Sequence, residues 1–158
     1  MSYKSKNKLV VDRDSGPYLA IPWSVVDCPS YMALSAYAKI LLIEVARQFV
    51  RDNNGRMLLS MRYLKTRGWN SSSMLHKAKM ELIKGGFIFE TVIGHRPNKA
   101  SWYALTFYGL NKIKGYDEGA YQCFERSAYK WKNPLPKKVI TPQVGQITSP
   151  ISPHGGLS

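Results

Sequence analysis

Acidic residues are scarce in this chain, and their scarcity is the first indication of its function. Only 10 Asp and Glu stand against 23 Lys and Arg in 158 residues, which gives a formal net charge of +13. A positive excess of this size predicts attraction to a polyanion, either DNA, RNA or an anionic membrane surface. Residues 60–100 alone hold 8 Lys and Arg against 2 Asp and Glu. We therefore expect the polyanion to bind in that part of the chain.

Long apolar runs and paired cysteines are also missing. No run approaches the ~18–20 residues that a membrane-spanning helix needs, so we expect no membrane partner. The basic start of the chain lacks the apolar block of a signal peptide. Cys28 and Cys123 lie far apart without a CxxC spacing, which favours two thiols in a reducing compartment over a disulfide or metal pair. Together these features predict a cytoplasmic protein that acts at the nucleoid.

Motifs for catalysis are absent as well. The three histidines, His76, His95 and His154, form no HxH or HExxH pattern, and no GxxxxGK[ST] or GxSxG sequence occurs. The carboxylates show no clustered arrangement that would hold a metal ion. The sequence thus predicts a binding protein that is not an enzyme and that needs no cofactor.

The middle of the chain instead contains a series of helix and strand signals. Ser35 is a suitable N-cap for a helix in "SAYAKILLIEVARQFV", where apolar residues recur at three- and four-residue steps. A short strand in "RMLLS" and a helix from Ser60 to Gly68 follow. A third helix, "SSSMLHKAKMELIKGG", leads into two β-rich runs on either side of the loop "GHRPNK". This order predicts an α+β winged helix-turn-helix, a three-helix core closed by a small antiparallel sheet with a basic wing.

The composition divides the chain into four parts. We expect a flexible basic arm over 1–17, the winged-helix domain over 18–110 and a short amphipathic helix within 111–132. That helix would pack on the domain or on a second copy. Residues 133–158 are rich in Pro, Gly and Ser with almost no acids, which predicts a disordered tail or a peptide that engages a partner protein.

The third helix has two unlike faces on a helical wheel. Its apolar residues cluster on one side. The opposite side carries cations, a hydroxyl and a thioether but no acid: Ser73, His76, Lys77, Met80 and Lys84. A solvated helix face normally mixes both signs of charge, so this face indicates a nucleic-acid contact.

The start of the same helix adds a phosphate site. Asn70, Ser71, Ser72 and Ser73 place hydroxyls and backbone N–H groups at the positive end of the helix dipole. Ser72 or Ser73, together with His76, Lys77 and Met80, would face base edges in the major groove, whose width admits a helix.

Two neighbouring segments complete the predicted interface. In helix-turn-helix docking the preceding helix crosses the DNA backbone, which suits Arg62, Lys65 and Arg67 to phosphate contacts. The loop would act as the wing, with Arg96 and Lys99 entering a minor groove and Pro97 restricting the backbone. The loop residues in the predicted interface are His95, Arg96, Asn98 and Lys99.

Several segments resemble a known group of proteins. The segments "LAIPWSVVDCPSYMALSAYAKILLIEVARQF", "NNGRMLLSMRYLKTRGW", "AKMELIKGGFI" and "RPNKASWYALT" resemble small winged-helix proteins of prophages, plasmids and bacteria. They are also similar to the origin-binding N-terminal domain of phage replication proteins of the lambdoid O type. The resemblance covers roughly residues 18–110. It implies that the third helix reads DNA and that the wing supports it, through Ser73, His76, Lys77, Arg96 and Lys99.

Three functions follow as hypotheses. The first is sequence-specific binding of double-stranded DNA in a phage or mobile-element setting, as a transcriptional regulator. The second is a replication initiator or accessory protein that binds an origin and recruits host replication factors through its tail. The third is a protein-interaction module that antagonises a host factor. The sequence does not decide whether the chain forms a homodimer, and Tyr121–Trp131 is the segment that it suggests as the dimer interface.

Overall fold

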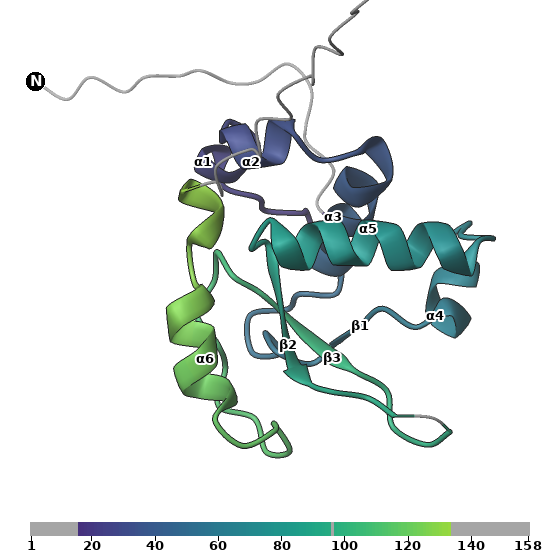
Figure 1. Ribbon diagram of the computed structural model, residues 1–158, viewed down its shortest axis with the longest axis vertical. Helices are drawn as coiled ribbons and strands as arrows, with labels where there is room; N and C mark the ends of the chain where they lie inside the picture. Colours follow the sequence, from purple (N-terminus) through teal and green to yellow (C-terminus); the bar gives the residue numbers. More distant parts are fainter. Residues whose placement is uncertain (1–15, 96, 134–158) are drawn as a thin grey trace, which may run out of the picture.

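The computed structural model describes residues 16–95 and 97–133, and the structural statements below refer to them. Three predicted features lie outside the described residues: the basic arm apart from its last residues, the tail from residue 134 onward, and Arg96. The described part is α+β, as predicted, with six α-helices and a three-stranded antiparallel sheet (Figure 1). In chain order the elements are α1 (Trp23–Val26), α2 (Pro29–Met32), α3 (Ala36–Arg47), β1 (Met57–Leu58), α4 (Met61–Lys65), α5 (Ser72–Lys84), β2 (Ile88–Val92), β3 (Trp102–Leu105), α6 (Ala120–Ser127) and the 3-10 helix η1 (Lys130–Lys132).

Serine side chains start the three central helices. The hydroxyl oxygen of Ser35 accepts a hydrogen bond from Ala38 N at 3.2 Å, that of Ser60 from Tyr63 N at 3.3 Å and that of Ser71 from Met74 N at 3.3 Å. Each bond satisfies a backbone N–H that the helix itself leaves without a partner. The predicted starts of these helices are therefore confirmed.

The central helices bury their apolar residues in a common core with the sheet. On α3 a stripe of Ala38, Leu41, Leu42 and Val45, all fully buried, packs on α5. Leu64 of α4 is also fully buried while Tyr63 is only half-buried, so the leucine fills the core at this turn. None of the helices in the described part is long and apolar enough to cross a membrane.

The sheet has the order β1-β3-β2, so the last strand lies between the other two. β2 and β3 form an antiparallel hairpin from the pair Ile88–Leu105 to the pair Val92–Trp102, with an irregularity between Glu90 and Val92. The loop of this hairpin, residues 93–101, projects beyond the end of the sheet (Figure 1). We call it the β2–β3 loop.

The N-terminal segment covers one end of the core, as its apolar composition suggested. Val25, Cys28 and Leu34 are buried in the same cluster as the helices and the sheet. The sequence did not predict α2, whose N-cap is unusual because Cys28 Sγ accepts the hydrogen bond from Tyr31 N at 3.3 Å. Trp23, by contrast, is 82% exposed.

The C-terminal segment packs on the domain itself. Phe124 of α6 is buried and meets Phe89 of β2 edge to face, with ring centroids 5.7 Å apart. α6 lies within the expected segment 111–132 and ends before Trp131, because the chain leaves the helix at Ala128 and Tyr129 has a left-handed φ of 60°. The break turns Trp131 inward, where it is 1% exposed and stacks on Phe87 at 6.4 Å. The apolar side of this segment is thus used inside the domain.

A single buried amide joins the turn after α3 to the end of the sheet. Asn54 is fully buried, and its Nδ2 donates to the carbonyl oxygens of Leu105 at 3.0 Å and Gly109 at 2.8 Å. Its Oδ1 accepts from Leu105 N at 2.8 Å, and its own backbone N–H donates to Asn111 Oδ1 at 2.8 Å. No local sequence pattern indicated this role of Asn54 in the core.

Replacing Asn54 by Asp tests this connection. The change keeps the size of the side chain but sets an oxygen against backbone carbonyls that now accept N–H groups. We expect the free energy of unfolding to fall by about 3 kcal/mol, measured by urea denaturation with tryptophan fluorescence. Gln122→Glu makes the same change of chemistry at an exposed position of α6 and should leave the midpoint nearly unchanged.

Candidate functional site

The outer face of α5 is basic because its single acid is turned inward. Ser73, His76 and Lys77 are exposed. Glu81 instead reaches α3, where its Oε2 accepts a hydrogen bond from Ser35 N at 2.9 Å. That bond satisfies a backbone N–H at the start of α3 and withdraws the only carboxylate of α5 from the outer face.

The remaining residues of α5 range from buried to exposed. Leu75, Ala78 and Leu82 are buried, as expected. Lys79 lies at the edge, with its Nζ 5.9 Å from the centre of the Tyr103 ring. Met80 is half-buried, so it offers less contact area than a fully outward residue. Lys84 is exposed but lies twelve residues after Ser72, about 18 Å along the helix, which separates it from the start of α5.

The start of α5 offers exposed polar groups. Ser71 uses its hydroxyl as the N-cap, and its Oγ also lies 3.3 Å from Ser73 Oγ. Asn70 and Ser72 are exposed beside them. The hydroxyls therefore gather at the positive end of a 13-residue helix, where an anion is stabilised.

The cations predicted on α4 and in the turn after it differ in their exposure and in whether their charge is paired. Arg62 and Lys65 are exposed on α4. Arg67 instead pairs with Glu44 of α3, with Nε 2.8 Å from Oε2, and only 36% of its side chain is exposed. The hydrogen bond and the charge of Glu44 raise the pKa of the Arg67 guanidinium. Because its charge is already balanced, Arg67 is a weaker candidate for phosphate contact than the sequence suggested.

The β2–β3 loop is held at its base by bonds that close it. Gly94 N donates to Ser101 Oγ at 2.9 Å, and Lys99 N donates to the carbonyl oxygen of His95 at 3.0 Å. A side chain at Gly94 would collide with the backbone of Ser101, so only glycine allows this close approach. His95, Pro97, Asn98 and Lys99 are exposed, whereas the predicted contact Arg96 lies outside the described residues.

Asp117 joins the loop to the segment before α6. Its Oδ2 accepts a hydrogen bond from Ile93 N at 2.6 Å, and its Oδ1 lies 3.2 Å from Lys99 Nζ. These contacts, the hydrogen bond from Ile93 first and Lys99 after it, hold the pKa of the Asp117 carboxyl below its usual value. The sequence gave no local signal for this role, since Asp117 lies 24 residues from Ile93 and belongs to no motif.

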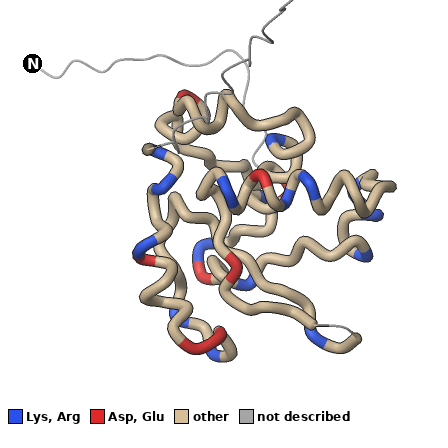
Figure 2. The backbone as a smooth tube through the Cα atoms, viewed as in Figure 1, with Lys and Arg blue, Asp and Glu red and all other residues tan. Residues whose placement is uncertain are grey.

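Most of the predicted site residues lie on one side of the molecule. Figure 1 shows α4, the start of α5 and the β2–β3 loop on the same side, away from α6. In the same view, Figure 2 shows basic positions on each of these three elements. The elements on that side carry Arg62, Lys65, Asn70, Ser71, Ser72, Ser73, His76, Lys77, His95, Asn98 and Lys99, and we call this set of residues the basic face.

The described residues offer no arrangement for metal chemistry. Within residues 16–95 and 97–133, no three His, Cys, Asp or Glu side chains lie close enough to hold a metal ion. Cys28 and Cys123 are both free thiols, the first buried and the second exposed.

Comparison with known proteins returns no relative. No protein-family model matches the chain, and neither the curated proteins nor the solved structures give a match.

Replacing Asp117 by Asn tests how the loop is anchored. Because the folded-state pKa of Asp117 is lowered, its charged form stabilises the fold above the unfolded-state pKa of about 4, and this contribution is lost as the pH falls through the folded-state pKa. We expect wild type to be more stable than Asp117→Asn near pH 6, and the gap in urea midpoint to close towards about pH 2. Glu118→Gln removes one negative charge from the same exposed turn and should not reproduce this pH-dependent gap.

Proposed function

We propose that this chain is a winged helix-turn-helix protein that binds specific sites in double-stranded DNA and thereby regulates transcription. In this proposal α5 is the recognition helix and the β2–β3 loop is the wing. The observation that carries it is the outer face of α5, which combines exposed cations and hydroxyls while its only acid caps α3 instead.

The geometry of α5 suits entry into a major groove. That groove is about 12 Å wide and admits one helix. The exposed Ser72, Ser73, His76 and Lys77 lie in the first half of α5, the part that reaches base edges in helix-turn-helix docking. Lys77 suits guanine acceptors, and the hydroxyls suit bases or phosphates. Met80 would reach a thymine methyl group only through the smaller part of its surface that is exposed.

Phosphate contacts would fix the position of the helix. Arg62 and Lys65 of α4 are exposed beside the start of α5, where they would meet the DNA backbone without reading its sequence. Lys99 would act from the wing, with Asp117 holding its stem in position. Duplex RNA fits this surface less well, because its deep and narrow major groove does not admit side chains that read bases.

A pair of charge reversals tests the recognition helix. We expect Lys77→Glu to weaken binding to a duplex that contains a selected site by at least about 100-fold, because it places a negative charge against phosphates and bases. Arg126→Glu makes the same change of net charge at an exposed position of α6, on the other side of the molecule, and should weaken binding much less. Fluorescence anisotropy with a labelled duplex measures both. Equal losses for the two variants would show that net charge alone drives binding.

Salt dependence tests the phosphate contacts. If the four Lys and Arg side chains of the basic face neutralise phosphates, the affinity should fall by about 100-fold as salt rises from about 50 to about 200 mM. The slope of log affinity against log salt gives the number of contacts, and Lys65→Ala should reduce it by about one. An affinity that does not change with salt contradicts the proposal.

The regulatory role has its own test. Selection from a random duplex library should return a defined sequence, since direct readout by α5 discriminates between bases. That sequence, placed across a reporter promoter, should lower expression when the protein is present, and Lys77→Glu should restore it. A library that returns no preferred sequence argues against a sequence-specific regulator.

A further inference from the structure

A hollow lies between α3 and the turn that joins α4 to α5, and we call it the turn pocket. Its volume is about 320 Å³, at the lower end of the roughly 300–1,000 Å³ that is usual for small-molecule sites. Its lining is half apolar and half polar or backbone: Tyr37, Ile40, Trp69 and Met74 on the one hand, Arg67, Gly68, Asn70 and Ser71 on the other. Such a mixture is typical of small-molecule sites, where a few polar groups orient a ligand on apolar walls.

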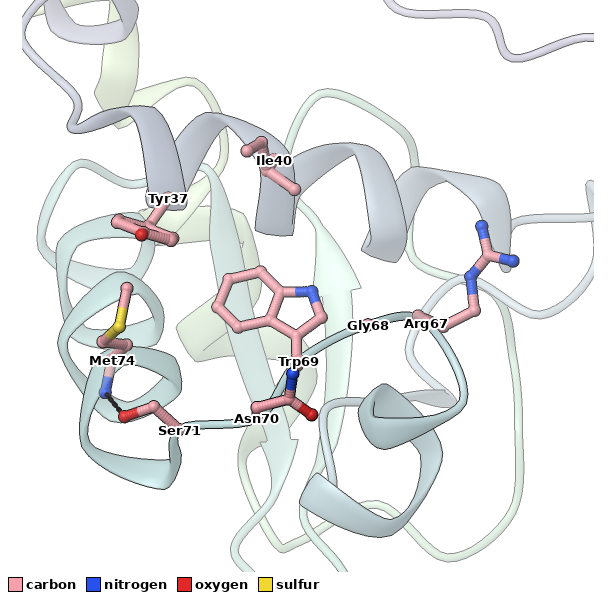
Figure 3. A pocket seen from close by; sticks show the side chains of 8 residues that line it. All are labelled: Tyr37, Ile40, Arg67, Gly68, Trp69, Asn70, Ser71 and Met74. Carbon is pink, nitrogen blue, oxygen red and sulfur yellow. Dashed lines mark hydrogen bonds between the residues drawn. The ribbon is translucent and has the colours of Figure 1, made fainter.

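Trp69 forms the floor of the turn pocket. Figure 3 shows its ring at the centre, with Tyr37 and Met74 on one side and Ile40 above. The Trp69 ring meets Tyr37 edge to face, with centroids 6.2 Å apart. Tyr37 and Ile40 are 51% and 48% exposed, so neither side chain is used up in the core. The flat ring of a ligand would find aromatic partners here at the spacing that such pairs prefer.

The indole N–H of Trp69 is a donor without an acceptor. The residue is only 7% exposed, and no hydrogen bond satisfies this N–H within the described residues. The enclosed side-chain atoms without a partner in that part of the chain are Tyr63 Oη and Trp131 Nε1, so the N–H of Trp69 stays accessible from the pocket. Figure 3 shows the ring nitrogen on the side towards Gly68 and Arg67. An unpaired donor on a buried side chain costs free energy, and an acceptor on a ligand would remove that cost.

The polar side of the turn pocket favours a single negative charge. None of its lining residues is Asp or Glu. Arg67 has five N–H donors and uses two of them on Glu44, which leaves three. Asn70 and Ser71 precede the first turn of α5, at the positive end of its dipole. Because Glu44 already balances the charge of Arg67, the donors suit one carboxylate better than a polyphosphate.

We propose that the turn pocket binds a small aromatic carboxylate and that this ligand weakens DNA binding. The ring would lie against Trp69, and the carboxylate would accept the Trp69 N–H. Asn70 and Ser71 line the pocket and also belong to the basic face, so the ligand would bring negative charge next to the start of α5. A DNA phosphate at that place would be repelled. The effect on DNA rests on the proposed function, whereas binding of the ligand does not.

Heteronuclear NMR of the full chain without DNA tests the site. Cinnamate is the probe, since it joins one flat ring to one carboxylate. We expect it to shift the indole N–H signal of Trp69, assigned with Trp69→Phe, with a dissociation constant below about 1 mM at about 0.15 M salt. The signal of Trp131, whose Nε1 is enclosed, is the internal reference and should not move. A Trp69 signal that does not shift up to about 10 mM cinnamate overturns the proposal.

Two substitutions on α3 separate the pocket from the general charge of the chain. Ile40→Glu places a carboxylate in the pocket wall and should raise the dissociation constant of cinnamate at least about 10-fold. Ile43→Glu makes the same change of charge at an exposed position outside the lining and should have little effect. Circular dichroism establishes that both variants are folded. Equal losses for the two variants would show unspecific attraction to a chain of charge +13 and would overturn the site.

Two further probes test the chemistry of the ligand. Cinnamyl alcohol keeps the ring without the charge, and acetate keeps the charge without the ring. Each should bind at least about 10-fold more weakly than cinnamate, because the proposed site needs both the aromatic contact and the charge-assisted hydrogen bond. Acetate that shifts the Trp69 signal as strongly as cinnamate contradicts an aromatic site.

Fluorescence anisotropy with a labelled duplex that contains the selected site tests the effect on DNA. Saturating cinnamate should weaken DNA binding by wild type at least about 5-fold, and by Ile40→Glu much less. Cinnamyl alcohol at the same concentration should have little effect. A DNA affinity that stays the same while the NMR signal shows the pocket occupied overturns the regulatory part of the proposal. A chain that binds no DNA contradicts the proposed function instead, and the NMR titration still decides whether the ligand site exists.

Discussion

The buried amide of Asn54 is the interaction on which the arrangement of the domain depends. It connects the turn after α3 with the end of β3 and with the segment that follows, and its two bonds to Leu105 are buried. The Tyr116 hydroxyl strengthens this connection, because it donates a hydrogen bond to the Asn54 carbonyl oxygen at 3.0 Å. Because α3, β1 and β3 meet there, the amide sets where the sheet lies under the helices. The hairpin that carries the β2–β3 loop takes its direction from that sheet.

A second constraint is how the few acids of the domain are used. Glu81 caps α3, Glu44 balances Arg67, and Asp117 anchors the β2–β3 loop. Each carboxylate makes a structural contact between elements that are distant in sequence. The exposed cations at the start of α4 and on the outer face of α5 therefore have no acid among them.

The sequence predicted what depends on neighbours along the chain. Ser35 and Ser60 act as caps through residues three positions away, and the stripe of α3 follows from its spacing, so these features were readable. The break in the chain at Tyr129 could not be predicted in this way. It is stabilised by the packing of Trp131 on Phe87, a residue that is distant in the sequence. The site follows the same rule. The outer face of α5 could be predicted from a helical wheel, whereas the pairing of Arg67 with Glu44, 23 residues away, required the tertiary fold.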